Sequence, residues 1–139
     1  MISTVLSIRG GRNTIFLDAN ILMEVFFERQ KLQAVRTKLA SMKGAFDLST
    51  SILVVSILFY YAEKHKVDKQ AVHKFLTNYI LLDVTAEDYE WAKQNDTGDF
   101  EDALQMACAM RHDATHFVTL DKLLPKNYAN HSEIKIVLL

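Results

Sequence analysis

The chain has 139 residues, of which 50% are hydrophobic, 24% charged and 10% aromatic, with four glycines and one proline. This composition is that of one compact globular domain and excludes a disordered chain, which would be poor in apolar residues. Sixteen basic and 17 acidic side chains give a net charge of −1, so no long-range positive field would hold the molecule on a nucleic acid. If the protein acts on a polyanion, it needs a local basic patch or a bound cation.

Cysteine content and hydropathy set further bounds. The single cysteine, Cys108, excludes a disulfide framework within the chain and fits a reducing compartment. The longest apolar run, residues 52–62, is interrupted by Ser56 and is too short to cross a bilayer. Residues 1–8 lack the basic start and long apolar stretch of a secretory signal. We therefore expect a cytoplasmic protein that does not contact a membrane.

The first elements in chain order are a strand and two helices. Residues 1–13 are predicted to be an N-terminal extension, and residues 14–139 a single domain. The domain opens with a short apolar run, residues 14–17, that is suited to a buried strand. The apolar spacing then becomes that of two successive helices, and Gly44 follows them where a left-handed C-terminal cap would lie.

The rest of the domain alternates strands with helices. The further strands are predicted at 45–49, 80–84, 116–120 and 134–138, and the further helices at 50–65, 68–79, 86–95 and 99–111. Asp68 is a predicted N-cap, and Thr85 with Asp88 a predicted capping pair. Strands that are separated by helices pair in parallel and carry helices on both faces of the sheet. The predicted fold class is therefore α/β, a three-layer α/β/α domain with a central parallel sheet of four to five strands.

Acidic side chains follow the predicted strands. Ligands of open parallel sheets bind at the carboxyl ends of the strands, and here Asp18 ends the first strand and Asp121 the fourth. Asp99 and Asp102 open the helix that leads into the fourth strand. Because they are three residues apart, they project from one side of its first turn, whereas Glu101 between them is expected to point elsewhere. We expect these aspartates to converge on one rim of the sheet.

The first helix adds two polar residues, Asn20 and Glu24, which share one side of it beside Asp18. Crowded carboxylates repel one another, and some would stay protonated without a countercharge. A hard divalent cation such as Mg²⁺ or Mn²⁺ removes this repulsion and leaves room for a phosphate oxygen and a water. The structural alternatives are that Asp18, Asp99 and Asp121 cap helices or turns and that Glu24 lies on a solvated face.

Three stretches resemble the signatures of PIN domains, small metal-dependent ribonucleases that include the toxins of bacterial VapBC toxin–antitoxin pairs. The stretches are residues 16–22 (FLDANIL), 98–105 (GDFEDALQ) and 118–121 (VTLD). The second stretch is the most specific. Order and spacing agree from about residue 14 to the end of the chain, so the resemblance implies a PIN-like fold for nearly all of it.

The resemblance also implies roles for individual residues. The aspartates that match the catalytic, metal-binding acids of the family are Asp18, Asp99, Asp102 and Asp121. Glu24 matches an acid that many members carry on the first helix and would complete the metal site. Asn20 matches a residue that orients the first aspartate. Thr119 is placed either to hydrogen-bond a phosphate or to pack against its strand neighbours.

The function implied by the resemblance is Mg²⁺- or Mn²⁺-dependent hydrolysis of RNA phosphodiester bonds. The protein would be the toxin of a VapBC-type pair, with an antitoxin protein as partner, and would form a homodimer. One position departs from the family, which commonly has a glutamate about six residues past a Ser or Thr in the helix after the second strand. Counting from Thr50 reaches Ser56. The alternative is therefore a catalytically weakened PIN-like module that binds RNA or protein.

Other classes fit the sequence less well. A haloacid dehalogenase-type enzyme needs a second aspartate where this chain has Asn20, and a receiver domain needs its acceptor aspartate after a later strand. Four basic residues are candidates for contacts with an RNA backbone, and the simpler interpretation is that their charges are solvated: Arg9, Arg12, Lys122 and Lys126.

Overall fold

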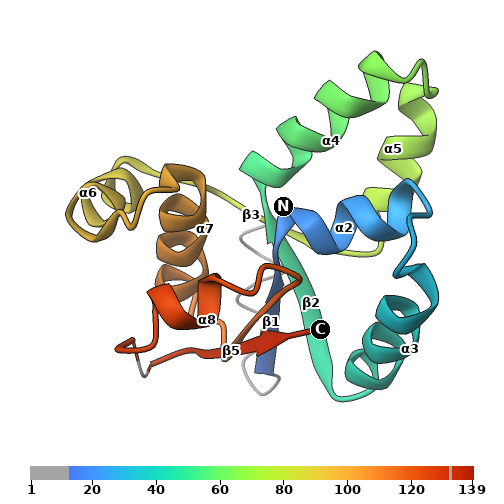
Figure 1. Ribbon diagram of the computed structural model, residues 1–139. Helices are drawn as coiled ribbons and strands as arrows, with labels where there is room; N and C mark the ends of the chain where they lie inside the picture. The colour runs from blue at the N-terminus through green and yellow to red at the C-terminus, as the bar shows by residue number, and fades with distance from the viewer. Residues whose placement is uncertain (1–12, 132) are drawn as a thin grey trace.

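The computed structural model describes residues 13–131 and 133–139, so the predicted N-terminal extension lies, except for Asn13, outside the described residues. The strands are β1 (Asn13–Leu17), β2 (Phe46–Ser51), β3 (Ile80–Leu82), β4 (His116–Thr119) and β5 (Lys135–Leu138). The helices are α2 (Ala19–Phe26), α3 (Leu32–Lys43), α4 (Ile52–Lys64), α5 (Lys69–Leu76), α6 (Ala86–Asn95), α7 (Phe100–Arg111) and α8 (Leu124–Asn127). Strands and helices alternate along the chain as predicted (Figure 1).

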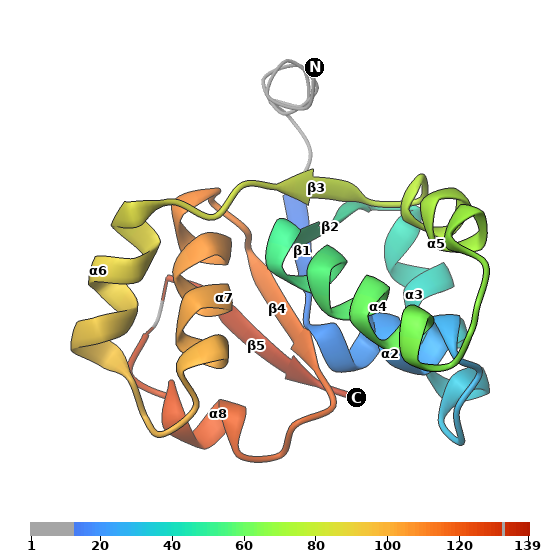
Figure 2. The ribbon, with the colours of Figure 1, turned by 90° about the horizontal axis from the view of Figure 1, so that it is seen from above.

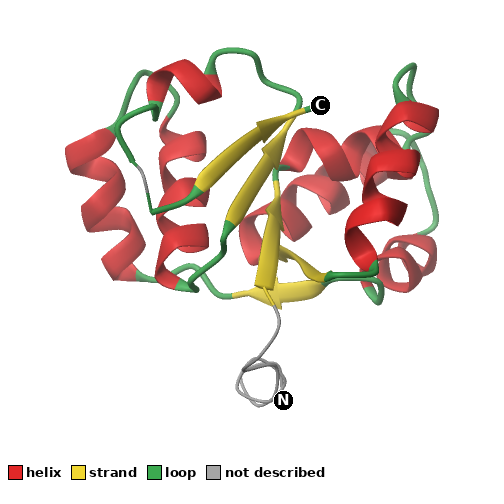
Figure 3. Cartoon of the chain, turned by 90° about the horizontal axis from the view of Figure 1, so that it is seen from below, coloured by secondary structure: helices red, strands yellow, loops and turns green. Residues whose placement is uncertain are grey.

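The five strands form one sheet in the order β3-β2-β1-β4-β5, and every neighbouring pair is parallel. Helices α2 to α5 cover one face of this sheet, and helices α6, α7 and α8 cover the other (Figures 2 and 3). The predicted three-layer α/β/α class with a parallel sheet is confirmed. No helix within residues 13–131 and 133–139 combines the length and hydropathy that a membrane span requires.

Two apolar cores follow from the alternation of side chains along the central strands. Ile15 and Leu17 of β1 point into the core beneath α2 to α5. Phe16, between them, points into the core beneath α7 and α8, where its ring stacks on Phe117 of β4 with the centroids 5.0 Å apart. All four side chains are at most 1% exposed. The buried β1–β4 pair therefore contributes side chains to the apolar cores on both faces of the sheet.

The boundary between β2 and α4 differs from the prediction. Hydroxyl groups of Ser49 and Thr50 donate to the carbonyls of Ile15 and Leu17 at 2.9 Å each, which extends the strand. Ser51 then caps α4 by accepting from the backbone N–H of residue 54. Polar residues that pair with neighbouring backbone groups thus behave as strand residues, and the helix begins two residues later than predicted.

Helix caps were predicted with mixed success. The Asp68 carboxylate accepts from the backbone N–H of Gln70, and the N–H of Thr85 donates to Asp88, so both predicted caps are confirmed. The left-handed cap at Gly44 is wrong, because this residue ends α3 with φ −66° and ψ −29°. A right-handed conformation suits any residue, so a glycine is not required there.

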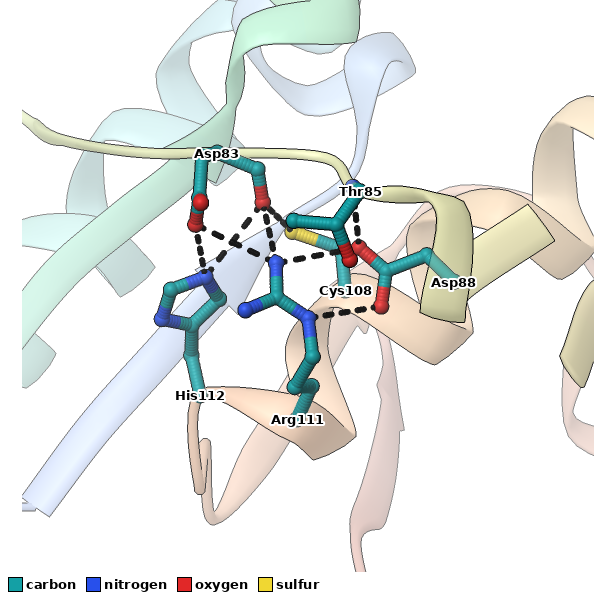
Figure 4. A network of polar contacts seen from close by, with 6 residues as sticks. All are labelled: Asp83, Thr85, Asp88, Cys108, Arg111 and His112. Atoms are coloured by element: carbon teal, nitrogen blue, oxygen red, sulfur yellow. Dashed lines mark hydrogen bonds and ion pairs between the residues drawn. The ribbon is translucent and has the colours of Figure 1, made fainter. Parts of the chain in front are cut away.

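A polar network joins the end of β3, the start of α6 and the end of α7 (Figure 4). The Arg111 guanidinium donates to Asp88 at 2.8 Å and to both the carboxylate and the carbonyl of Asp83, at 3.1 and 2.7 Å. His112 contacts the Asp83 carboxylate at 2.7 Å. Hydrogen bonds from Arg111, opposed by slight burial, lower the pKa of Asp83. The Asp88 side chain is only 1% exposed, so its charge depends on Arg111.

We expect the substitution Arg111→Leu to lower the free energy of unfolding by about 3 kcal/mol, because it leaves the buried Asp88 carboxylate without its cationic partner and with only the N–H of Thr85 as a donor. Urea denaturation at pH 7 measures this loss. Adding Asp88→Asn to the same variant removes the uncompensated charge and should recover part of the stability. A loss no larger than that of Lys38→Leu, a change at an exposed position of α3, would show that the network contributes little.

Candidate active site

The site lies at the carboxyl edge of the sheet, where the strand order reverses. β1 pairs with β2 on one side and with β4 on the other, and the chain proceeds outward in both directions from there. Asp18 directly follows β1, and Asp121 comes two residues after the end of β4. Ligands of open α/β sheets bind at such a switch point. The two aspartates therefore flank the place where the fold itself favours a site.

Asp18 is the most constrained of the acids. It is 3% exposed and is the N-cap of α2. One carboxylate oxygen accepts from the backbone N–H of Ala19 at 2.7 Å and from Nε2 of Gln105 at 3.2 Å. The other accepts from the Thr119 hydroxyl at 2.7 Å and from Nδ2 of Asn20 at 3.2 Å. Burial raises the pKa of Asp18, and the hydrogen bonds, that from Thr119 first, oppose the rise.

Asn20 and Thr119 connect Asp18 to the end of β4. The Asn20 amide also donates to the Thr119 hydroxyl at 3.2 Å, and its oxygen accepts from the N–H of Leu120 at 3.0 Å. The Thr119 hydroxyl accepts in addition from the N–H of Asp121 at 3.0 Å. Because Thr119 is fully buried and engaged with these neighbours, it occupies the packed position rather than one that faces a substrate. Asn20 lies where a residue that orients Asp18 must lie.

The acids at the start of α7 face the same region. Asp99 is the N-cap of the helix, and its carboxylate accepts from the N–H of Asp102 at 3.2 Å. Asp102 is half-buried, and burial followed by the charges of Asp18, Asp99, Asp121 and Glu101 raises its pKa to about 7. In the part of the chain that the structure describes, neither a hydrogen-bond donor nor a cation contacts the Asp102 carboxylate. The four predicted aspartates thus form one electrostatically coupled cluster.

Glu101 belongs to this cluster as well. The residue as a whole is exposed. Partial burial of its carboxyl group, followed by the charges of Asp99 and Asp18, nevertheless raises the pKa of that group. The expectation that the Glu101 side chain points away from the site stays a prediction, although its charge interacts with those of Asp99 and Asp18. Residues 99–102 span about one helical turn, so the three carboxylates of this segment lie at the same end of α7.

Glu24 lies at the border of the site and has a structural contact of its own. Its carboxylate is 8% exposed and accepts from the backbone N–H of Lys31, which precedes the first turn of α3. It is absent from the groups that shift the pKa of Asp18 or Asp102. The contact closes the loop between α2 and α3, so Glu24 combines a position beside the site with a role in the fold.

The chemistry of the cluster suits a hard divalent cation. Its donors are carboxylate oxygens, which Mg²⁺ and Mn²⁺ prefer, and the Asp102 carboxylate has no hydrogen-bond partner among the described residues. Among the described residues, however, no group of three or more Asp, Glu, His or Cys side chains lies in an arrangement that could hold a metal ion. Asp18 already accepts four hydrogen bonds from the protein. The acids repel one another through space, and a cation would relieve that repulsion.

Gln105 is a site residue to which the sequence reasoning gave no role. It is fully buried, and its Oε1 atom has no hydrogen-bond partner among the described groups, although its Nε2 donates to Asp18. A signal was present: glutamine is the one long polar side chain in the run of residues 103–109, and it lies three residues after Asp102. That spacing puts both side chains on one face of α7.

Comparison with known proteins agrees with this geometry. A family model described as "PIN domain" matches residues 14–123. The chain belongs to the PIN domain family. Comparison with curated protein sequences finds no significant match for this PIN domain. The predicted resemblance is confirmed at the level of family and fold.

Solved structures with the same fold come from toxin–antitoxin complexes. The PIN domain is similar to a chain of VapBC2 from Rickettsia felis bound to a promoter DNA fragment, with a TM-score of 0.70, 17% identity and coverage of 91% of this chain and 98% of that one. A toxin–antitoxin complex from Klebsiella pneumoniae has a TM-score of 0.67 and 18% identity, with coverage of 86% of this chain and 94% of that one. DNA-bound VapBC from Salmonella typhimurium has a TM-score of 0.63 and 16% identity, with coverage of 89% of this chain and 96% of that one. At these identities the likeness is one of fold.

We expect Asp102→Asn to stabilise the PIN domain at high pH. A carboxyl group whose folded pKa of about 7 exceeds its ordinary value of 3.8 favours the folded state at low pH and costs stability as the pH rises through that interval. Asn removes this cost, which solvent screening reduces to roughly 1 kcal/mol at pH 8. Thermal unfolding between pH 4 and pH 8 measures the effect, which should vanish toward pH 4. A gain of the same size at both ends would contradict the electrostatic explanation.

We expect Gln105→Leu to raise the pKa of Asp18, because it removes a donor that favours the ionised carboxylate. Carboxyl ¹³C NMR titration of Asp18 measures the shift. Stability should fall little, because the change also removes the buried amide oxygen that lacks a partner. The control Gln70→Leu alters an exposed glutamine of α5 and should leave Asp18 unchanged. An unaltered Asp18 titration in the Gln105 variant would refute the positioning role.

Proposed function

We propose that this PIN domain is a Mg²⁺- or Mn²⁺-dependent endoribonuclease and the toxin of a VapBC-type toxin–antitoxin pair. One observation carries the proposal. A half-buried carboxylate, Asp102, lacks a partner among the described residues and faces the charges of four other acids at the switch point of the sheet. Groups whose pKa is shifted by burial and by neighbouring like charges cluster at functional sites, and a ligand of opposite charge offsets their repulsion. Membership of the PIN domain family supports the same conclusion.

The residues that would hold the cation are Asp18, Asp99, Asp102 and Asp121. Glu24 borders this set and would contribute from the α2 side. The chemistry that a bound divalent ion supplies is Lewis-acid activation of water and of the phosphodiester. Because ligation needs the ionised carboxylate, Asp102 releases its proton when the cation binds, and affinity should tighten between pH 6 and pH 8.

The remaining site residues keep the acids in place. Asn20, Gln105 and Thr119 donate to Asp18 and hold the plane of its carboxylate between β1 and α7. Thr119 also accepts from the N–H of Asp121, so the same hydroxyl sets the start of the loop that carries the second aspartate. These contacts position the acids before substrate arrives, which lowers the cost of ordering them during the reaction.

The proposed partners are RNA as substrate, an antitoxin protein and a second copy of the chain. Support for the antitoxin comes from the structural neighbours, whose descriptions name VapBC and toxin–antitoxin complexes. Support for a homodimer comes from α4, where Ile52 and Tyr60 are 47% and 63% exposed. Large apolar side chains exposed on one helix are typical of a protein interface. We place this activity in the cytoplasm.

A catalytically weakened binding module is the second candidate. Ser56, the residue at the expected glutamate position, is exposed on α4, and residues 48–62 contain no aspartate or glutamate. Helix α4 therefore brings no carboxylate toward the cluster over this stretch. If the aspartates alone do not support hydrolysis, the domain would bind RNA or protein without cleaving.

The test is cleavage of end-labelled RNA by the wild-type chain with and without Mn²⁺. We expect Mn²⁺-dependent products with 5′-phosphate ends, and a loss of about 100-fold or more in rate for Asp102→Asn, because a metal ligand and its charge are removed. The control is Asp113→Asn, which alters an exposed aspartate beyond the other end of α7. Its left-handed φ of 58° also suits asparagine.

Mn²⁺ binding measured by electron paramagnetic resonance separates the two candidates. The nuclease requires tight Mn²⁺ binding that Asp102→Asn weakens and Asp113→Asn does not. RNA binding without cleavage by any of the three proteins would favour the binding module. Equal cleavage by all three would mean that a contaminating nuclease is present and that the proposed activity is absent.

A further inference from the structure

A cationic pocket borders the acidic site. It lies along the loop between α2 and α3, has a volume of about 460 Å³, and is lined by Glu24, Arg29, Gln30, Lys31 and Leu120. Two of these five side chains carry a positive charge. The pocket was not foreseen from the sequence, because its residues come from a loop and from the segment after β4, about 90 positions later in the chain.

The positive charges of this pocket are not neutralised by ion pairs. Arg29 and Lys31 are exposed, and within residues 13–131 and 133–139 neither forms a salt bridge. The one acid of the lining, Glu24, is buried and accepts from the backbone N–H of Lys31. The charged ends of the two cations therefore remain available to an anion.

The backbone of the loop is fixed by hydrogen bonds to its surroundings. The N–H of Arg29 donates to the carbonyl of Glu24 at 3.0 Å, and the carbonyl of Arg29 accepts from the N–H of Leu32 at 3.1 Å. Glu28 has φ 49°, a left-handed conformation that is costly for a residue other than glycine. The turn that places Arg29 beside the pocket is thus held by its hydrogen bonds rather than by an intrinsic preference.

The pocket is continuous with the acidic site through Leu120. This residue lines the pocket, its N–H donates to Asn20, and it directly precedes Asp121. One residue thus lines the cationic pocket and directly precedes an aspartate of the acidic site. A nucleic-acid strand whose reacting phosphate meets the acidic site would carry a neighbouring phosphate toward the cations.

We propose that the Arg29–Lys31 pocket binds a non-reacting phosphate of a single-stranded RNA substrate. The proposal rests on the function proposed above and supplies the local basic patch that a chain of net charge −1 needs for a polyanion. It assigns to Arg29 and Lys31 the role for which the sequence suggested Lys122 and Lys126. Such contacts add affinity without reading sequence, because phosphates are the same in every nucleotide.

The test is binding of a fluorescent single-stranded RNA, measured by anisotropy at several salt concentrations, for the wild type and for Arg29→Gln, Lys31→Gln and the double variant. We expect Kd to rise by about fivefold or more in the double variant and the slope of log K against log salt to flatten by about 0.7, the value for one phosphate contact on a single strand. In cleavage assays KM should rise while kcat stays within about twofold, since the lost contact is not specific to the transition state.

The matched control is Lys38→Gln, an exposed lysine of α3 that does not line the pocket. Equal effects of Lys38→Gln and the double variant, or an unchanged Kd and salt slope, would overturn the proposal. Absence of RNA binding by the wild type would overturn it too. Competition by a polyglutamate peptide as strong as that by RNA would assign the pocket to an acidic protein partner instead.

Failure of this proposal and failure of the proposed function have different signatures. A wild type that binds RNA but does not cleave it refutes the nuclease, while the binding and salt data still decide the pocket. A wild type that cleaves, with KM and salt slope unaltered in the double variant, refutes the pocket and leaves the nuclease intact.

Discussion

The buried carboxylate of Asp18 is the interaction on which the arrangement of the site depends. It accepts hydrogen bonds from the start of α2, from the interior of α7 and from the end of β4. Removing a carboxylate from water costs several kcal/mol, and each hydrogen bond to a charged group contributes about 1.5–3 kcal/mol. Four such bonds offset part of that cost, and together they join three elements that are distant in sequence.

The same interaction explains why the sequence alone does not distinguish a structural role of these acids from a functional one. Asp18 and Asp99 are indeed helix N-caps, and Asp121 accepts from the N–H of Leu123 in the turn before α8. Each capping hydrogen bond occupies only one oxygen or one lone pair of the carboxylate. The negative charge of the group still acts on its neighbours. A cap at the carboxyl edge of a parallel sheet is therefore also a potential ligand, and the two interpretations describe one side chain.

Sequence patterns predicted the sheet, which is confirmed, because it follows from local periodicity and from the alternation of strands and helices. The convergence of the aspartates stays a prediction that rests on the rule that parallel strands end at one edge. Sequence patterns failed where a side chain's partner lies far along the chain. Ser49 and Thr50 belong to β2 because their hydroxyls bond to β1, and Gln105 belongs to the site because it reaches Asp18, 87 positions away. The Arg29–Lys31 pocket was missed for the same reason, since Leu120 closes it.

The two edges of the sheet have a consequence for how a partner can dock. β3 has three residues and β5 has four, so each edge exposes few backbone groups with which an incoming strand could pair. Short edge strands discourage the extension of a sheet by another chain. Association with a partner is thereby directed to the helical layers, where side-chain shape and charge, rather than main-chain pairing, determine which protein is recognised.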